Sequence, residues 1–251
     1  MLDGAVLFFA GVLTGVVNTV AGSGTIFSLG TMVLLGIPIE IANTTNRLGV
    51  LFQNIAGVLT FRRFGSFSEV KLPLSIVLST LCGAGLGAFF AATIQSKSFE
   101  SIALIVIMLM SVQTTLEIIG RTPALRRLKM SRLSMAAQLP LFFFIGFYGG
   151  LIQIGVGILL LLGLRSFLNL KWNESNYFKL LVVLIYTVPT LAYFIWVDMI
   201  EWKAGLVLAF GQIFGAYMAA RVTSINLKLQ SLIPYFVLVM LLLTAIRILL
   251  S

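Results

Sequence analysis

The sequence predicts an all-α membrane protein that crosses the bilayer several times. Hydrophobic residues make up 59% of the chain and charged residues only 10%, whereas a soluble domain carries roughly 25% charged residues. A chain with so few charges cannot cover a water-facing surface. Several apolar runs reach the length of about 20 residues that a helix needs to cross the hydrocarbon core. We therefore expect almost the whole chain to lie in or against the lipid bilayer.

Apolar runs and their interruptions divide the chain into two similar halves. The first half has a long run, a short run of about half a membrane's length and three further runs: 4–21, 25–35, 42–61, 72–94 and 101–119. The second half repeats this order: 134–152, 157–164, 177–197, 204–222 and 232–250. We predict an N-terminal repeat at 1–119, a basic cytoplasmic connector at 120–133 and a C-terminal repeat at 134–251.

Residue matches between the halves favour a true internal repeat. Gly11-x-x-x-Gly15 recurs as Gly146-x-x-x-Gly150, and Cys82–Ala92 aligns with Phe210–Ala220 in five small residues. Small residues are frequent in membrane helices, where they let two helices approach closely, so each match alone is weak. Five of them in one register, in the corresponding element of each half, favour a repeat.

Charge placement predicts the orientation of the chain. The net charge of +9 lies mostly in short connectors between apolar runs. This is the pattern of cytoplasmic loops in an inner membrane, so we expect no nucleic-acid partner. The connectors at Gly65 and Lys129 then lie in the cytoplasm, and those near Glu40, Lys97 and Asp198 lie outside. We predict a multi-pass protein of the plasma (inner) membrane with both termini extracytoplasmic.

The predicted orientation makes the two repeats inverted. The first half begins outside and the second begins inside, so residues 4–119 should superpose on 134–250 after a half-turn about an axis in the membrane plane. Each half would then contain a glycine-broken helix pair or a re-entrant hairpin, followed by three transmembrane helices. Inverted repeats with broken helices are the architecture of secondary transporters.

The glycine-rich breaks are the strongest functional signal. A helix broken at bilayer depth leaves backbone groups unpaired, and such backbone is tolerated only where protein or a wet cavity satisfies it. The half-helix after a break presents free N–H groups and the positive end of its dipole, which suits an anion. The candidate binding residues here are Asn18, Thr19, Gly22, Ser23, Gly24, Thr25, Gln153, Gly155 and Gly157. The alternative is a flexible kink that only lets helices pack closely.

A second polar cluster lies at the start of the third run. Helical spacing puts four polar residues near one face, which we expect to look toward the glycine break: Asn43, Asn46, Arg47 and Asn54. We predict that Thr44, Thr45 and Asn46 also supply hydrogen-bond donors to the ligand.

Two cations occupy matching places in the halves. An arginine can pair bidentately with a sulfonate or carboxylate, and Lys179 in the second half answers Arg47 in the first. We predict that these two residues supply charge at opposite mouths of the site. The alternative places both cations at the membrane interface, where they reach lipid headgroups.

Missing residue types exclude most enzyme classes. The chain has no histidine and one cysteine, and no carboxylate lies in the middle of an apolar run. It therefore offers no acid–base pair or metal site at membrane depth, and it lacks the phosphate-binding loop of an ATPase. We predict no enzymatic activity, no cofactor and no metal. A non-transporting membrane scaffold is the alternative of a different class, and a homo-oligomer is left open.

These motifs resemble the TauE/SafE family of sulfite and organosulfonate exporters. The resemblance covers nearly the whole chain and is most specific at Gly11–Gly24 and Ala42–Thr45. It implies a secondary transporter that exports small sulfur-containing anions, such as sulfite and sulfoacetate, across the plasma membrane. Two departures, Ser23 within the glycine cluster and Ser28 in place of a proline, lie beside the expected site. They leave open a carrier of another small anion or of a neutral solute.

Overall fold

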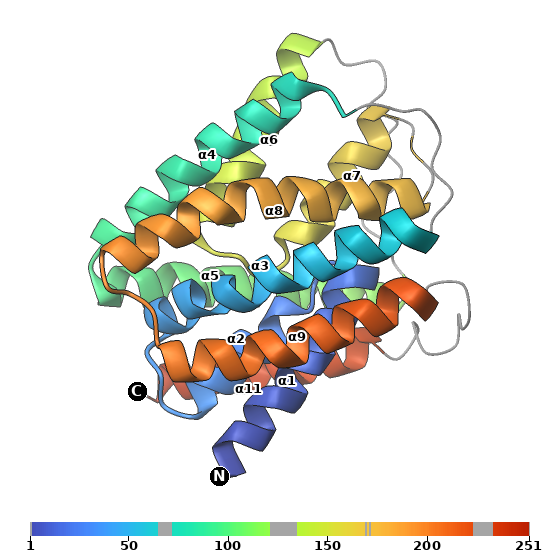
Figure 1. The fold of residues 1–251 in the computed structure, drawn as a ribbon. Coiled ribbons are helices and arrows are strands. Elements are labelled where there is room, and N and C mark those ends of the chain that lie inside the picture. Colours follow the sequence, from blue (N-terminus) through green and yellow to red (C-terminus); the bar gives the residue numbers. More distant parts are fainter. Residues whose placement is uncertain are drawn as a thin grey trace.

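The computed structural model describes residues 2–64, 72–120, 135–168, 170, 172–222 and 233–250, and Figure 1 shows them as an all-helical bundle. The helices of the first half are α1 (Leu2–Val20), α2 (Thr25–Leu34), α3 (Ile39–Phe64), α4 (Leu74–Thr93) and α5 (Ser96–Ile118). Those of the second half are α6 (Met135–Leu151), α7 (Val156–Leu168), α8 (Trp172–Trp196), α9 (Trp202–Val222) and α11 (Ile233–Leu249). The predicted all-α class is confirmed.

Five of the described helices are long and apolar enough to cross a membrane. They are α4, α5 and most of α1, α8 and α9. Helix α3 has 26 residues and runs through the molecule beside α8 and α9 (Figure 1), but its polar residues keep it out of the apolar class. The protein is therefore a multi-pass membrane protein, and its least apolar long helix lies at its centre.

Both predicted breaks are present, and each is the turn of a helical hairpin. Helix α1 ends at Val20 and α2 begins at Thr25, with the chain folded back so that Gly24 touches the backbone of α1 at Thr14. Helices α6 and α7 also run antiparallel, because the rings of Phe142 and Phe167 lie 5.8 Å apart, centroid to centroid. Of the two alternatives predicted from the sequence, a broken helix or a helical hairpin, the structure therefore shows a hairpin in each half.

The first helix of each half packs against the fourth helix of the other half. A Cβ at Gly11 would lie 2.5 Å from the carbonyl oxygen of Leu208, and one at Gly215 would lie 2.1 Å from that of Val12, so α1 and α9 are in backbone contact. Gly83 and Gly146 bring α4 and α6 equally close. In each of these contacts, a helix of one half packs against a helix of the other half. The half-turn that would relate the two halves stays a prediction.

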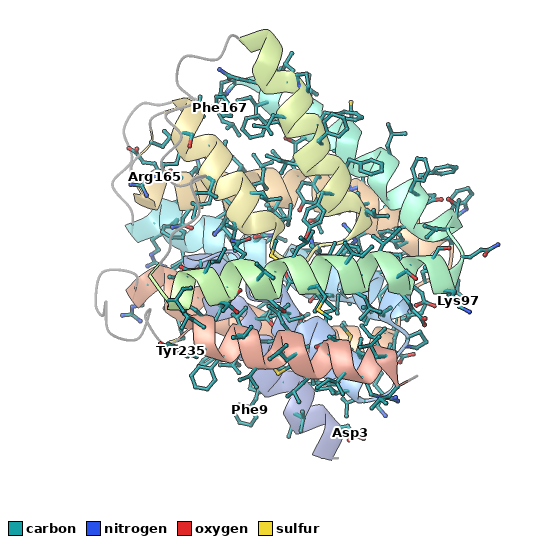
Figure 2. The ribbon with its side chains drawn as sticks, turned by 180° about the vertical axis from the view of Figure 1, so that it is seen from behind. Asp3, Phe9, Lys97, Arg165, Phe167 and Tyr235 are labelled. Atoms are coloured by element: carbon teal, nitrogen blue, oxygen red, sulfur yellow. The ribbon has the colours of Figure 1, made fainter. Side chains whose placement is uncertain are left out.

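The two ends of the bundle differ in charge. Both termini lie toward one end (Figure 1), and Figure 2 shows Asp3 and Lys97 on that side, with Arg165 at the opposite end. Arg62, Arg63 and Arg221 are exposed in the last turns of α3 and α9. The connectors at Gly65 and Lys129 lie outside the described residues, so the predicted orientation stays a prediction.

Candidate functional site

The two hairpin turns touch each other inside the molecule. A Cβ at Gly22 would lie 2.6 Å from the carbonyl carbon of Gly157, and a Cβ at Gly157 would lie 2.7 Å from Cα of Gly22. Gly22 also has φ +82°, a conformation that only glycine adopts readily. The N-termini of α2 and α7 therefore begin close together, although they are more than a hundred residues apart in sequence.

Asn18 holds the turn of the first hairpin. Its Oδ1 accepts a hydrogen bond of 3.1 Å from the Thr25 N–H, which is one of the free N–H groups at the start of α2. Its Nδ2 donates to Thr25 Oγ1 at 3.2 Å and to Gln53 Oε1 of α3 at 3.3 Å. Because Asn18 and Thr25 satisfy each other, the sequence prediction that both face a ligand needs a rearrangement of this turn.

Asn46 links the two hairpins through side-chain hydrogen bonds. Its Oδ1 accepts from Ser28 of α2 at 2.5 Å and from Gln212 of α9 at 3.0 Å, and its Nδ2 donates to Gln153 Oε1 at 3.3 Å. Asn43, one turn earlier, donates to Leu151 O of α6 at 2.9 Å. Asn43 and Asn46 thus connect α3 to α2 and to the second break.

Arg47 is completely buried and binds the end of α6. Its Nη2 donates to the carbonyl oxygens of Gly149 and Gly150 at 3.1 and 2.5 Å, and its Nη1 lies 3.5 Å from Thr190 Oγ1. Its guanidinium carbon stands 4.9 Å from the ring centroid of Phe194. With 0% exposure, Arg47 contacts no headgroup and lies at no mouth of the site, contrary to both readings of the sequence. Tertiary packing places it in the interior.

Lys179 makes the corresponding contact with the end of α1. Its Nζ donates to the carbonyl oxygens of Asn18 and Thr19 at 2.8 and 3.3 Å and to Asn176 Oδ1 at 2.8 Å. The side chain is 1% exposed, so the mouth position and the headgroup alternative are wrong for it too. A cation suits this place because helix C-termini carry free carbonyls and the negative end of the dipole.

Each of the two cations therefore binds the half of the chain to which it does not belong. Arg47 of the first half binds the hairpin of the second, and Lys179 of the second half binds the hairpin of the first. All hydrogen-bond acceptors found for both are neutral oxygens. In the described part of the chain, these two buried cationic side chains thus lie beside the hairpin turns and contact neutral oxygens and, for Arg47, the ring of Phe194.

The family of the chain follows from comparison with known sequences. The family model described as sulfite exporter TauE/SafE matches residues 7–248. The chain belongs to this family. No solved structure matches it significantly.

Relatives of this TauE/SafE chain are named probable membrane transporter proteins. One from Sinorhizobium sp., ORF9, is 26% identical over 219 residues, which cover 86% of this chain and 82% of the relative. One from Haemophilus influenzae is 24% identical over 221 residues, or 86% and 84% of the two chains. YfcA of Escherichia coli K12 is 25% identical over 219 residues, or 86% and 79%. The family and these names make the chain a membrane transporter.

Several buried polar atoms of this TauE/SafE protein lack a hydrogen-bond partner near the hairpins. They include Arg47 Nε, Asn54 Nδ2, Thr19 Oγ1, Asn176 Nδ2 and Thr187 Oγ1. Leaving a buried polar group unpaired costs roughly 1–3 kcal/mol, so each of these groups would be stabilised by a polar partner such as a ligand or water.

The remaining sequence-predicted residues divide into two groups. Thr44 donates to the carbonyl oxygen of Met199, and Thr45 Oγ1 accepts from the Glu201 N–H at 2.9 Å. Both therefore fasten α3 to the connector between α8 and α9, away from the turns. Gly155 has φ +72° and belongs to the second turn, whereas Ser23 is half-buried in the first.

Several residues of the buried polar network were not predicted as site residues. Gln53, Ser28 and Gln212 each bind an asparagine of the network. Gln212 had a visible signal, because it is an amide inside an otherwise apolar span. Its partners could not be predicted, since they come from α3 and not from the neighbouring helices of its own half.

Proposed function

We propose that this protein is a secondary transporter that exports small sulfur-containing anions, such as sulfite and sulfonates, across the plasma membrane. The observation that carries the proposal is the pair of buried cations, Arg47 and Lys179, with only neutral acceptors at the meeting point of two helical hairpins. Burying an unpaired charge is costly, and an anion between the hairpins would offset that cost.

The backbone of the hairpins supports the same ligand class. Helices α2 and α7 begin at the turns, so the positive ends of two helix dipoles point toward one region. Free N–H groups at helix N-termini bind anions in many proteins. At an effective dielectric constant of about 20, an anion about 4 Å from one cation gains about 4 kcal/mol. Two cations and two helix N-termini favour an oxyanion over a neutral solute.

The proposed mechanism moves the hairpins around a fixed ligand. Neutral amides line most of the network, and Arg47 and Lys179 are already held by carbonyls. This arrangement lets an anion bind without a tight ion pair, so release stays fast, as conduction in channels also requires. Rocking of one half against the other would open the Gly22–Gly157 contact first to one side and then to the other.

Flux of labelled anions into proteoliposomes tests this function. Purified protein should exchange radiolabelled sulfite, sulfoacetate or methanesulfonate for the same unlabelled anion inside the vesicle. Protein-free liposomes measure leakage, and liposomes with labelled glycerol measure passage of a neutral solute. Exchange of glycerol but of none of the three anions would replace the anion carrier by a solute carrier. No exchange of any compound would favour the scaffold.

A further inference from the structure

Lys179 and Arg47 occupy corresponding places but differ in one chemical property. An ammonium group can release its proton, whereas a guanidinium group keeps its charge. We propose that Lys179 binds and releases the proton that this carrier moves together with its anion, an inference that rests on the anion transport proposed above. Arg47 then supplies the charge that never changes.

The number of hydrogen bonds that Lys179 donates to the first hairpin depends on whether its side chain is protonated. Its Nζ donates to Asn18 O, Thr19 O and Asn176 Oδ1, and an ammonium has three N–H donors. A neutral amine has two, so loss of the proton removes one of these hydrogen bonds. Two of the three acceptors are carbonyls in the last turn of α1, next to the first hairpin turn. Deprotonation therefore loosens α8 from the hairpin that contains Gly22.

Other titratable groups around α8 do not fill this role. The elements packed on α8 are α1, α3, α4 and α7. The ionisable side chains on the described parts of these helices are Asp3, Glu40, Arg47, Arg62, Arg63, Cys82 and Arg165. Arg62, Arg63 and Arg165 are exposed, and Arg47 binds the other hairpin. Asp3 and Cys82 are exposed, and Glu40 lies in the first turn of α3.

Helix α8 itself carries Glu174 and three tyrosines besides Lys179. They are Tyr177, Tyr186 and Tyr193, and none of them is a hydrogen-bond partner of Lys179. Glu174 is buried in the first turns of α8 and has contacts of its own, but none of the three hydrogen bonds of Lys179 reaches it. Helix α6 also approaches α8, where Gly149 lies beside Tyr186, and the hydroxyl of its Tyr148 donates to Ile154 O at the second turn. Among the described hydrogen bonds, Lys179 is the titratable side chain that binds the end of the first hairpin helix.

Anion binding and protonation of Lys179 then favour each other. An anion near the turns stabilises the ammonium, and by linkage the ammonium raises anion affinity by the same factor. The proton enters from water on the loading side and leaves to water on the other side. One proton accompanies one monovalent anion, so the transported charge is zero. The anion and pH gradients together set the direction of net flux.

Proteoliposomes containing a pH-sensitive dye and radiolabelled methanesulfonate test the coupling, because this sulfonate stays a monoanion over the neutral range. With the parental protein, an imposed methanesulfonate gradient should move protons in the same direction, and a potassium diffusion potential should not change the flux. Affinity should fall by up to tenfold per pH unit as Lys179 loses its proton. Lys179→Arg should lose proton movement, and the flux that it retains should become sensitive to the potential. Lys97→Arg, an exposed exchange of the same kind, and Glu174→Gln should behave like the parent.

The outcomes separate the coupling from the transport function. Net methanesulfonate flux down its gradient without proton movement in the parental protein, or proton movement that survives in Lys179→Arg, would overturn the role of Lys179 and leave the anion carrier standing. Loss of proton movement in Glu174→Gln with retained exchange would transfer the role to that carboxylate. Absence of exchange in the parent would remove the anion site and this inference with it. The parental measurement decides even if Lys179→Arg does not insert.

Discussion

The buried position of Arg47 changes the expected effect of substituting it, compared with an arginine at the membrane interface. A residue at an interface could lose its charge without affecting folding, but the guanidinium of Arg47 binds two carbonyls of α6. Arg47→Gln should therefore lower both anion affinity and stability. Hydrogen bonds to a charged group contribute roughly 1.5–3 kcal/mol, which is about one to two decades in binding. Arg47→Lys keeps the charge and should lose less of both.

Exchange in proteoliposomes and thermal unfolding in detergent measure the two effects of these Arg47 variants. The matched control is Arg165→Gln, because Arg165 is exposed at the end of the bundle in Figure 2. Parental exchange by Arg47→Gln at every concentration would show that Arg47 is only a structural cap of α6. The proposed anion site would then rest on Lys179 and the hairpin turns.

Substitutions at three glycines distinguish the effect of backbone strain from the effect of close contact between the hairpin turns. Gly36 has φ +90° with open space around it, Gly157 touches Gly22 without a positive φ, and Gly22 has both features. Gly36→Ala should cost only the strain of a left-handed residue, about 1–2 kcal/mol, and keep transport. Gly157→Ala should impair transport through overpacking, and Gly22→Ala should impair it most. Exchange assays with melting curves check this order, and equal transport by all three variants would contradict a role for the turn contact.

At the scale of elements, backbone contact through small residues holds the halves together. A Cβ at Gly83 would lie 2.0 Å from the carbonyl oxygen of Phe143, whereas one at Gly85 on the same helix meets nothing within 4 Å. Gly83→Leu should push α4 away from α6 and lower the melting temperature strongly. Gly85→Leu faces outward and should leave it nearly unchanged. Thermal unfolding in detergent compares the two variants, and equal melting temperatures would mean that the α4–α6 contact adds little to stability.

The hairpins explain why the second helix of each pair is short. Helices α2 and α7 have 10 and 13 residues, about half the length that a membrane-spanning helix needs. Helix α2 is buried from Thr25 to Val33, and α7 begins with the buried Val156 and Gly157. The turn groups that lipid could not satisfy are satisfied by Asn18, Asn43 and other protein groups. The helix lengths thus follow from hairpins that meet in the interior.

At the scale of the molecule, the orientation in the membrane can be tested with cysteines. After Cys82, the free cysteine of the chain, is replaced by serine, Lys97→Cys and Arg165→Cys place one thiol at each end of the bundle (Figure 2). The positive-inside rule predicts that an impermeant thiol reagent labels position 97 in intact cells and position 165 only after lysis. The reverse pattern would overturn the predicted orientation in the membrane.

The sequence by itself determined the class, the helix breaks and the close-packing motifs. A 59% hydrophobic composition leaves no alternative to a membrane, because water cannot solvate such a surface. Glycine clusters stop helices locally, so the turns at Gly22 and Gly155 were visible without tertiary information. The Gly-x-x-x-Gly spacing likewise marks a helix face, although it does not name the partner helix.

Only the tertiary structure decided which half each polar residue serves. The sequence suggested that Arg47 faces the first break at a mouth of the site, but α3 carries it to the end of α6 in the second half. Lys179 crosses in the other direction to α1, and Thr44 and Thr45 leave the site for the connector at Met199–Glu201. Local periodicity fixes the face of a helix on which a residue lies. The partner of that face depends on long-range packing between the halves, which no local pattern encodes.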